Sequence, residues 1–136
     1  MIFIDLDHFK QVNDTKGHLV GSRLLAEVGY LIKAQLRLID FAFRYGGDEF
    51  VVLLPQTGKD QALVVAKRLQ DSLRSGRFGA DDGLELSVRA SMGLATFPHD
   101  ARTPEDIIRQ ADEMMYVVKN TTRDSIGVAS RGVVEE

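Results

Sequence analysis

The chain has 136 residues, 44% of them hydrophobic, which fits one compact domain with a real core and leaves no room for a second. A formal net charge of -3 argues against broad electrostatic capture of nucleic acid, so DNA is not an expected partner. The sequence has no cysteine, no apolar run long enough to span a bilayer and no leader pattern, so we expect a cytoplasmic protein without a membrane segment.

Hydrophobic periodicity predicts the elements along the chain. The first segment is apolar on both faces, which is typical of a central strand covered by helices. The order of strands and helices along the chain predicts an α+β sandwich with a mainly antiparallel central sheet flanked by helices. The predicted elements are a strand at 2–6, a loop or short helix at 8–19, a helix at 21–37, strands at 41–44 and 50–54, a helix at 59–74, a loop at 75–83, a long strand at 84–97, a helix at 104–119 and a short strand at 125–129. The domain is expected to cover 1–130, with 131–136 as a frayed C-terminal tail.

A glycine pair joins the two strands of the predicted hairpin. Gly46 and Gly47 are expected to supply the positive φ angles of a two-residue loop. Asp48 and Glu49 follow, and because side chains alternate along a strand, their carboxylates should point to opposite faces. Alone, this pattern is most simply a solvated acidic hairpin. A second acidic element, Asp5-Leu6-Asp7 at the end of the first strand, favours a divalent cation site between the two.

These motifs make the chain resemble the GGDEF family, bacterial diguanylate cyclases that condense two nucleoside triphosphates into a cyclic dinucleotide. The resemblance implies a palm-like fold shared with class III nucleotidyl cyclases, and a homodimer in which each subunit presents one nucleotide. Family members also carry an upstream sensory or receiver domain and a Leu-Thr-x-Leu-x-Asn-Arg segment before the first strand, so this chain is expected to be trimmed at its N-terminus. The similarity extends from Ile2 to Arg123 through Asp5 to Lys10, Asn13-Asp14, Gly17-His18, Arg37 to Asp40, Gly46 to Phe50, Ser91 to Gly93, Ala111-Asp112 and Lys119.

The resemblance assigns the metal site to Asp5, Asp48 and the main-chain carbonyl of Leu6. Two Mg²⁺ or Mn²⁺ ions are expected there, because hard oxygen ligands suit these ions and a metal can activate the attacking hydroxyl. Asp7 falls on the same face as Asp5 and stays an alternative ligand, although family precedent favours Asp5. Glu49 is a candidate catalytic carboxylate, with a supporting or structural role as the alternative.

A second group of residues matches the phosphate-binding positions of the family. These are Lys10, Lys119 and Arg123, together with main-chain amides near His8 and Phe9. The usual Lys-x-x-Gly-Arg-Asn tail of the family stands here as residues 119–124 without the glycine. That departure leaves the placement of Arg123 open.

Base recognition is expected from Asn13 and Ser22. Members that use only GTP usually carry aspartate where this chain has Ser22. A hydroxyl can donate or accept a hydrogen bond and so tolerates either purine. The change resembles the hybrid promiscuous subgroup and predicts use of ATP beside GTP, giving cyclic GMP-AMP as well as cyclic di-GMP. The alternative is a strict GTP enzyme with weaker guanine affinity. His18 has no partner at ligand spacing and is expected to be structural.

Arg37 and Asp40 match the RxxD product-inhibition site of the family, which five residues separate from Gly46, and Arg68 falls where another arginine contributes. A planar guanidinium suits this task because it binds phosphate in two places and stacks on bases. The favourable interaction of an arginine with a helix C-terminus explains Arg37 alone but not the spacing. The non-enzymatic alternative is a degenerate domain that binds nucleotide or cyclic dinucleotide and signals by contact.

Overall fold

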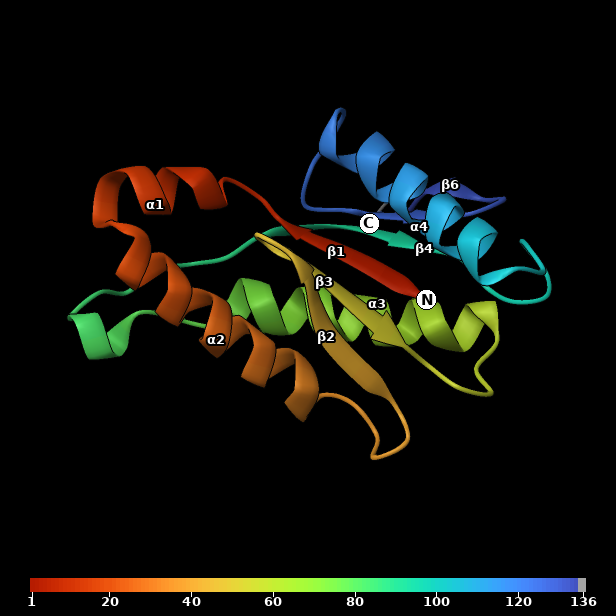
Figure 1. Cartoon of the computed structure of the whole chain (residues 1–136), viewed down its shortest axis with the longest axis horizontal. Helices are drawn as coiled ribbons and strands as arrows, with labels where there is room; N and C mark the ends of the chain where they lie inside the picture. The colour runs from red at the N-terminus through yellow and green to blue at the C-terminus, as the bar shows by residue number, and fades with distance from the viewer. Residues whose placement is uncertain (135–136) are drawn as a thin grey trace.

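The computed structural model describes residues 1–134, in which six strands form one sheet in the order β2-β3-β1-β4-β5-β6 and four α-helices flank it (Figure 1). Neighbouring strands are antiparallel except β4 and β5, which are parallel. The predicted α+β sandwich with a mainly antiparallel sheet is therefore confirmed. The elements are β1 Ile2–Leu6, α1 Phe9–Lys16, α2 His18–Ala34, β2 Phe41–Gly46, β3 Glu49–Leu53, α3 Lys59–Ser75, the 3-10 helix η1 Ala80–Asp82, β4 Ala90–Leu94, α4 Pro104–Lys119, β5 Ile126–Val128 and β6 Gly132–Val133.

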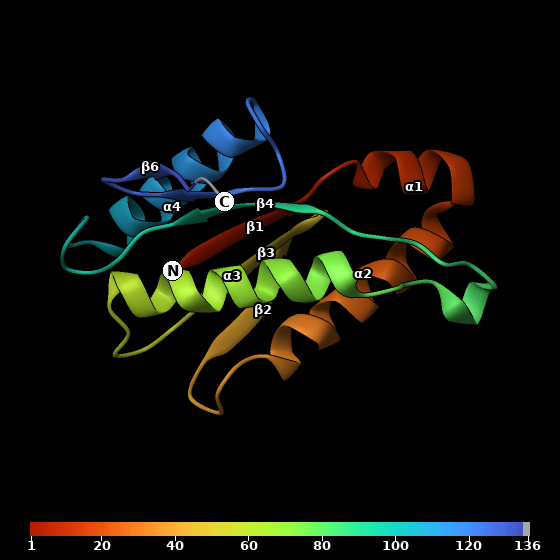
Figure 2. The ribbon, with the colours of Figure 1, turned by 180° about the vertical axis from the view of Figure 1, so that it is seen from behind.

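Two hydrophobic cores lie on opposite faces of the sheet, because side chains of the central strand alternate between them. Ile2 and Ile4 of β1 pack with α2 and α3, whereas Phe3 packs with α4. Seen from the two sides, α4 covers the face toward the viewer in Figure 1 and α3 covers the face toward the viewer in Figure 2. The β1 strand is thus buried on both faces, as its continuous apolar sequence predicts, and Asp5 is its one partly exposed residue.

Two predictions about strands are wrong. The long strand expected at 84–97 is regular only from Ala90 to Leu94, because Leu86 forms an antiparallel bridge with Phe78 and so belongs to an arm around η1. The frayed tail expected at 131–136 is wrong for Gly132 and Val133, which pair with β5 as strand β6. Residues 135 and 136 lie outside the described part of the chain.

Gly93 lets α4 lie directly against β4. A Cβ atom at this position would collide with the main-chain oxygen of Ala111 and the main-chain nitrogen of Met115, both on α4. We expect Gly93→Ala to lower the free energy of unfolding by about 1 to 3 kcal/mol, because α4 must move away from the sheet. Urea unfolding of the purified protein measures this change.

Gly29→Ala is the matched control for that substitution. A Cβ atom on Gly29 would lie 3.5 Å from Phe50, an ordinary contact, and Gly29 lies inside helix α2. Alanine should therefore leave the stability unchanged or raise it by up to about 1 kcal/mol. Equal effects of the two substitutions would show that close approach of α4 to β4 does not matter.

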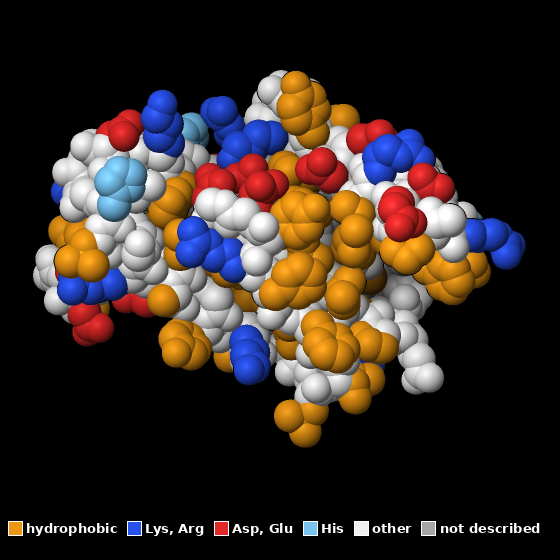
Figure 3. Space-filling model, viewed as in Figure 1, with side chains coloured by type: hydrophobic (Ala, Val, Ile, Leu, Met, Phe, Trp, Pro, Cys, Tyr) orange, Lys and Arg blue, Asp and Glu red, His pale blue; other side chains and the backbone are white. Residues whose placement is uncertain are grey.

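Helix α4 covers only part of the sheet face on which it packs. Phe41, Phe43 and Tyr45 of β2 are each more than two-fifths exposed, and hydrophobic side chains gather on this part of the surface in Figure 3. The ring of Tyr45 packs edge-on against Phe3, with centroids 5.0 Å apart. Within residues 1–134, no helix is long and apolar enough to cross a membrane.

Candidate active site

The carboxylates of Asp5, Asp7, Asp48 and Glu49 lie near one another where β1 ends beside the β2–β3 turn. Asp5 lies opposite Glu49 of β3 in the sheet register, so these two side chains share the α4 face. Asp48 occupies the turn, and its main-chain oxygen accepts a hydrogen bond from the Leu6 amide at 3.1 Å. Acidic side chains gather at this end of β1, with basic side chains next to them (Figure 3). The two acidic motifs predicted from the sequence therefore lie together.

Lys119, at the end of α4, places its ammonium group among the predicted metal ligands. Its Nζ lies 3.0 Å from Asp5 Oδ1, 3.0 Å from the Leu6 carbonyl oxygen and 3.3 Å from Asp7 Oδ1. A carboxylate and a carbonyl oxygen thus converge on one cation, which is the chemistry that a hard divalent ion needs. Within residues 1–134, no three histidine or acidic side chains are arranged to hold a metal by themselves. A metal here would also depend on the Leu6 carbonyl and on water or substrate oxygens.

Asp7 is buried and its oxygens are already hydrogen-bonded to the protein. The Ser91 hydroxyl donates to Oδ1 at 2.7 Å, and the Asp124 amide donates to Oδ2 at 3.0 Å. Only 1% of the Asp7 side chain is exposed. These contacts suit a residue that fixes the α4–β5 corner better than a residue that binds a metal.

The carboxylates of Asp5, Asp48 and Glu49, called the acidic centre below, are close enough to shift one another's pKa values. Burial raises the pKa of Asp5, the Lys119 hydrogen bond opposes this shift, and the charges of Asp48 and Asp7 add to it. Burial also raises the pKa of Glu49, and repulsion from Asp5, Asp112 and Asp48 adds to that shift. Because each carboxylate disfavours ionisation of its neighbours, a bound cation would be stabilised here.

Neither glycine of the pair is needed for a positive φ angle, and Gly46 alone makes room for a neighbouring side chain. The register pairs Gly46 with Glu49, so Gly47 and Asp48 form the turn, and neither glycine has a φ between +20° and +160°. The predicted positive φ angles are therefore wrong. A Cβ atom on Gly46 would lie 2.9 Å from Glu49 Oε1, so this glycine makes room for the carboxylate. The Arg44 guanidinium donates to the carbonyl oxygens of both glycines and closes the turn.

A cavity of about 310 Å³ separates the turn from α1 and α2. It brings together Asn13 and Ser22, the two predicted base-contacting residues. A Cβ atom on Gly21 would collide with the Asn13 side-chain oxygen, so Gly21 permits this position of Asn13. Asp48 lines this cavity while Glu49 faces Asp5, in agreement with the predicted opposite orientation. The lining residues are Phe9, Lys10, Asn13, His18, Ser22, Leu25, Arg44, Gly47 and Asp48.

A second cavity, of about 540 Å³, lies on the α4 side of the acidic centre. Of the predicted phosphate-binding residues, His8, Lys119 and Arg123 line it, whereas Phe9 and Lys10 line the first cavity instead. The missing glycine of the family tail does not strain position 122, because the left-handed angles fall on Arg123 and Asp124. The residues that line the second cavity are Asp7, His8, Arg89, Lys119, Asn120, Thr121, Thr122, Arg123 and Asp124.

Backbone strain marks this second cavity. His8, Arg123 and Asp124 have φ values of 60°, 51° and 45°, and they are three of the five non-glycine residues with positive φ in the described part of the chain. Such angles cost about 1 to 3 kcal/mol each and concentrate at functional sites. Their grouping around one cavity supports a binding function there.

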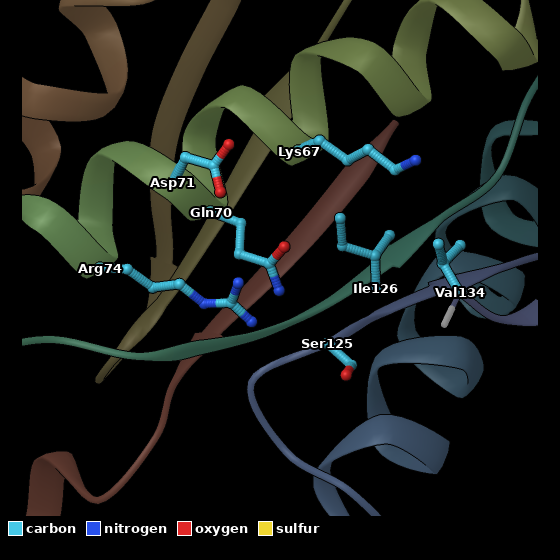
Figure 4. A pocket seen from close by; sticks show the side chains of 7 residues that line it. All are labelled: Lys67, Gln70, Asp71, Arg74, Ser125, Ile126 and Val134. Atoms are coloured by element: carbon cyan, nitrogen blue, oxygen red, sulfur yellow. The ribbon is translucent and has the colours of Figure 1, made fainter. Parts of the chain in front are cut away.

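Helix α3 anchors the Arg123 and Asp124 corner from behind. Arg74 Nε lies 3.1 Å from Asp124 Oδ1, and both Arg74 and Gln70 donate to the Asp124 carbonyl oxygen. Figure 4 shows Gln70 and Arg74 extending from α3 toward Ser125, where they line a separate cavity. With the Asp7 contact on the other side, the corner is held from two directions.

The predicted inhibition-site residues lie at the far end of the β2–β3 hairpin from the acidic centre. Arg37 and Asp40 form an ion pair at 2.8 Å, and hydrogen bonds from Arg37 lower the pKa of Asp40. Arg37 also donates to Thr57 Oγ1 at 2.9 Å, and Arg68 donates to the Gln35 carbonyl oxygen at 2.7 Å. The positive charge of Arg68 further lowers the Asp40 pKa, so the structure brings all three predicted residues together.

Sequence reasoning missed Arg44 and Arg89. Arg44 lies two positions before Gly46, so its spacing could have indicated a role in the turn. Arg89 carries no such local signal, because it reaches the second cavity only through the pairing of β1 with β4.

The comparisons with known proteins agree with the geometry. The family model described as diguanylate cyclase, GGDEF domain, matches residues 1–125. Diguanylate cyclase A of Treponema denticola is 34% identical over 98% of this chain and 36% of its own length. The chain spans between 28% and 36% of the length of the first curated relatives that it matches.

Solved structures give the same result. The GGDEF domain of PA1120 from Pseudomonas aeruginosa superposes with a TM-score of 0.89 and 36% identity, over 95% of this chain and 80% of that one. The GGDEF domain of DgcB from Caulobacter crescentus, solved in complex with c-di-GMP, superposes with a TM-score of 0.84 and 26% identity, over 94% and 75%. The matched model, the fold and the acidic turn beside β1 together establish that the chain belongs to the GGDEF domain family.

Proposed function

We propose that the protein condenses two purine nucleoside triphosphates into a cyclic dinucleotide and releases pyrophosphate. The observation that carries this proposal is the convergence of Asp5 Oδ1 and the Leu6 carbonyl on one cation, the Lys119 ammonium. This point lies between a cavity that holds the predicted base contacts and a cavity lined by arginine and lysine. A base in the first cavity, a metal at this point and phosphates in the second cavity would follow one another in the order that a bound nucleotide requires.

Each group of residues has a distinct task in this reaction. Asp5, Asp48 and the Leu6 carbonyl would hold Mg²⁺ or Mn²⁺, two ions per site. When bound, such ions lower the pKa of the attacking 3'-hydroxyl and neutralise charge on the phosphates. Lys119 lines both the acidic centre and the phosphate cavity, so it can bind a phosphate oxygen beside Arg123. Glu49, opposite Asp5 on the neighbouring strand, would add a further negative charge beside the metal.

The product contains two nucleotides, whereas one chain offers one base cavity and one acidic centre in its described part. The reaction therefore requires a homodimer in which two such sites face each other. The alternative function is a domain that binds nucleotide or cyclic dinucleotide without turnover. Incubation with GTP and magnesium, followed by mass identification of the products, separates the two, because only the enzyme forms cyclic di-GMP.

Ser22 supports a relaxed choice of base. It lines the first cavity together with Asn13, and its hydroxyl can serve guanine or adenine. We therefore include ATP among the substrates and cyclic GMP-AMP among the products.

With equal GTP and ATP, the protein is expected to release cyclic GMP-AMP beside cyclic di-GMP. Ser22→Asp should shift the output toward cyclic di-GMP by about ten- to a hundredfold, because a restored base contact is worth roughly 1 to 3 kcal/mol. Mass spectrometry of the competition mixture measures the ratio of products. Ser22→Ala is the control, since it removes the hydroxyl without adding charge. Exclusive use of GTP by the unmodified protein would rule out the relaxed selectivity.

The cluster of Arg37, Asp40 and Arg68 supports binding of the cyclic dinucleotide product. Its two guanidinium groups can bind phosphate and stack on guanine, and Asp40 holds Arg37 in place. The related domain of DgcB was solved with c-di-GMP, which supports the same ligand for this family member.

Arg37→Ala is expected to weaken binding of cyclic di-GMP by about tenfold or more, because one charged partner of the phosphate is lost. Titration calorimetry with cyclic di-GMP measures the affinity. Arg109→Ala is a matched control, since Arg109 pairs with Asp106 at the same spacing and is similarly exposed. If Arg37→Ala binds cyclic di-GMP as tightly as the unmodified protein, Arg37 does not belong to a product-binding site.

A further inference from the structure

Arg89 lines the second cavity, which is the proposed phosphate site, without belonging to any motif of the sequence. The pairing of β1 with β4 sets its direction: Asp5 lies opposite Ser91 and Leu6 opposite Ala90, and the Asp7 amide then donates to the Arg89 carbonyl at 2.8 Å. Side chains alternate along a strand, so Arg89 lies on the same face as Asp5 and Asp7. Its main chain is therefore fixed at the edge of the site while its side chain extends over the cavity.

The guanidinium of Arg89 has binding capacity left. Its ion pair in the described part of the chain is with Asp124, at 3.7 Å between Nε and Oδ2, which is longer than a hydrogen bond. Asp124 is held more closely by Arg74, at 3.1 Å. Because 48% of the Arg89 side chain is exposed, its planar donors can reach an anion in the cavity.

One lysine and two arginines line the cavity. Lys119, the third basic residue lining it, directs its ammonium to Asp5, Leu6 and Asp7. Arg123 and Arg89 are thus the basic residues of the lining whose charge is not directed at the acidic centre. A triphosphate carries several negative oxygens, and two guanidinium groups match them in pairs.

We propose that Arg89 is a phosphate-binding residue of this protein and contacts the nucleotide triphosphate together with Arg123. The inference rests on the proposed function of the site as a nucleoside triphosphate site. It adds a residue that the sequence motifs do not contain and that the sheet register brings to the cavity. A positioning residue, in contrast, would act only by holding the corner that carries Arg123.

Binding of nucleotides to variants of the intact chain tests the proposal. The probes are the αβ-methylene analogue of GTP and GMP, measured by calorimetry with magnesium present. Arg89→Ala should weaken binding of the triphosphate analogue by about tenfold and leave GMP within about twofold, because the lost contact is to the outer phosphates. Arg89→Lys should fall between, since it keeps the charge and loses the planar fork. Arg77→Ala, an exposed arginine paired with Glu85, should change neither affinity.

A double substitution separates direct contact from positioning. If Arg89 touches phosphate itself, Arg89→Ala should still cost about tenfold in an Arg123→Ala background. No further loss in that background, or equal affinities of Arg89→Ala and the unmodified protein, would overturn the proposal. Failure of the unmodified protein to bind the triphosphate analogue would instead overturn the proposed function, and the inference with it.

Discussion

Asp48→Asn is expected to lower turnover by on the order of a hundredfold or more, because Asp48 is a proposed metal ligand and a ligand of that kind contributes several kcal/mol to stabilising the transition state. The substitution removes a charge without changing the volume of the side chain. It also keeps the hydrogen bond from the Leu6 amide, which goes to the main-chain oxygen of residue 48. The fold should therefore survive while the reaction stops. Pyrophosphate release at saturating GTP and magnesium measures the loss.

Asp60→Asn is the control for charge alone. Asp60 is 85% exposed, lies in the first turn of α3 and pairs with Arg131, away from the acidic centre. It should keep full turnover and the same thermal unfolding as the unmodified protein. Normal activity of Asp48→Asn at ordinary magnesium concentrations would show that the two acidic motifs do not hold the metal.

Asp100→Asn should lower the free energy of unfolding by about 3 to 5 kcal/mol, more than any other substitution proposed here. The reason is that it leaves the buried Lys59 ammonium without its counter-charge. The Lys59 ammonium lies 2.5 Å from Asp100 Oδ1, and the two side chains are 8% and 0% exposed. Hydrogen bonds from Thr96 and Ser130 complete the carboxylate. Lys59 also donates to the Ala129 carbonyl, so the pair joins the start of α3 to both β4 and β5.

The pH dependence of stability gives a second measurement of the same pair. Burial alone would raise the pKa of Asp100, but hydrogen bonds from Lys59, Thr96 and Ser130 outweigh it and lower the pKa to about 2. The unfolded chain has the ordinary value of 3.8, so this stabilisation is complete above that pH and is lost as the pH falls toward 2. It amounts to about 2 kcal/mol.

Urea unfolding at several pH values between 2 and 7 measures both effects. In Asp100→Asn, the part of the acid-induced loss that comes from Asp100 should disappear. The control is Asp106→Asn, which breaks an exposed pair with Arg109 and should leave the stability nearly unchanged, because exposed pairs contribute little. Equal stabilities of Asp100→Asn and Asp106→Asn at pH 7 would contradict the assigned role of the buried pair.

The sequence was sufficient for features that depend on local patterning. The apolar run 2–6 predicted a buried central strand, and the spacing of Asp5 and Asp48 placed both at one end of the sheet. The proximity of Arg37 and Asp40 was also predictable, because the two residues are only three positions apart. Periodicity and spacing describe such features directly.

Features that depend on long-range packing could not be predicted in this way. Gly46 is small because the Glu49 side chain occupies the space beside it, which no backbone pattern reveals. Lys10 and Lys119 belong to one sequence-derived group, yet the sheet and α4 separate them into different cavities. The α2 helix begins at His18 instead of 21, because the left-handed Gly17 between α1 and α2 lets one helix follow the other directly.

The most direct test is product formation by this chain with its subunits forced together. The protein fused to a constitutive dimerisation segment, given GTP and magnesium, should release cyclic di-GMP and two pyrophosphates for each cyclic product. The same fusion carrying Asp48→Asn should release neither, and the unfused chain should work faster as its concentration rises. Cyclic di-GMP formed at a rate per chain that does not depend on dimerisation, or GTP hydrolysed to GDP without any cyclic product, would contradict nucleotidyl transfer between two facing sites.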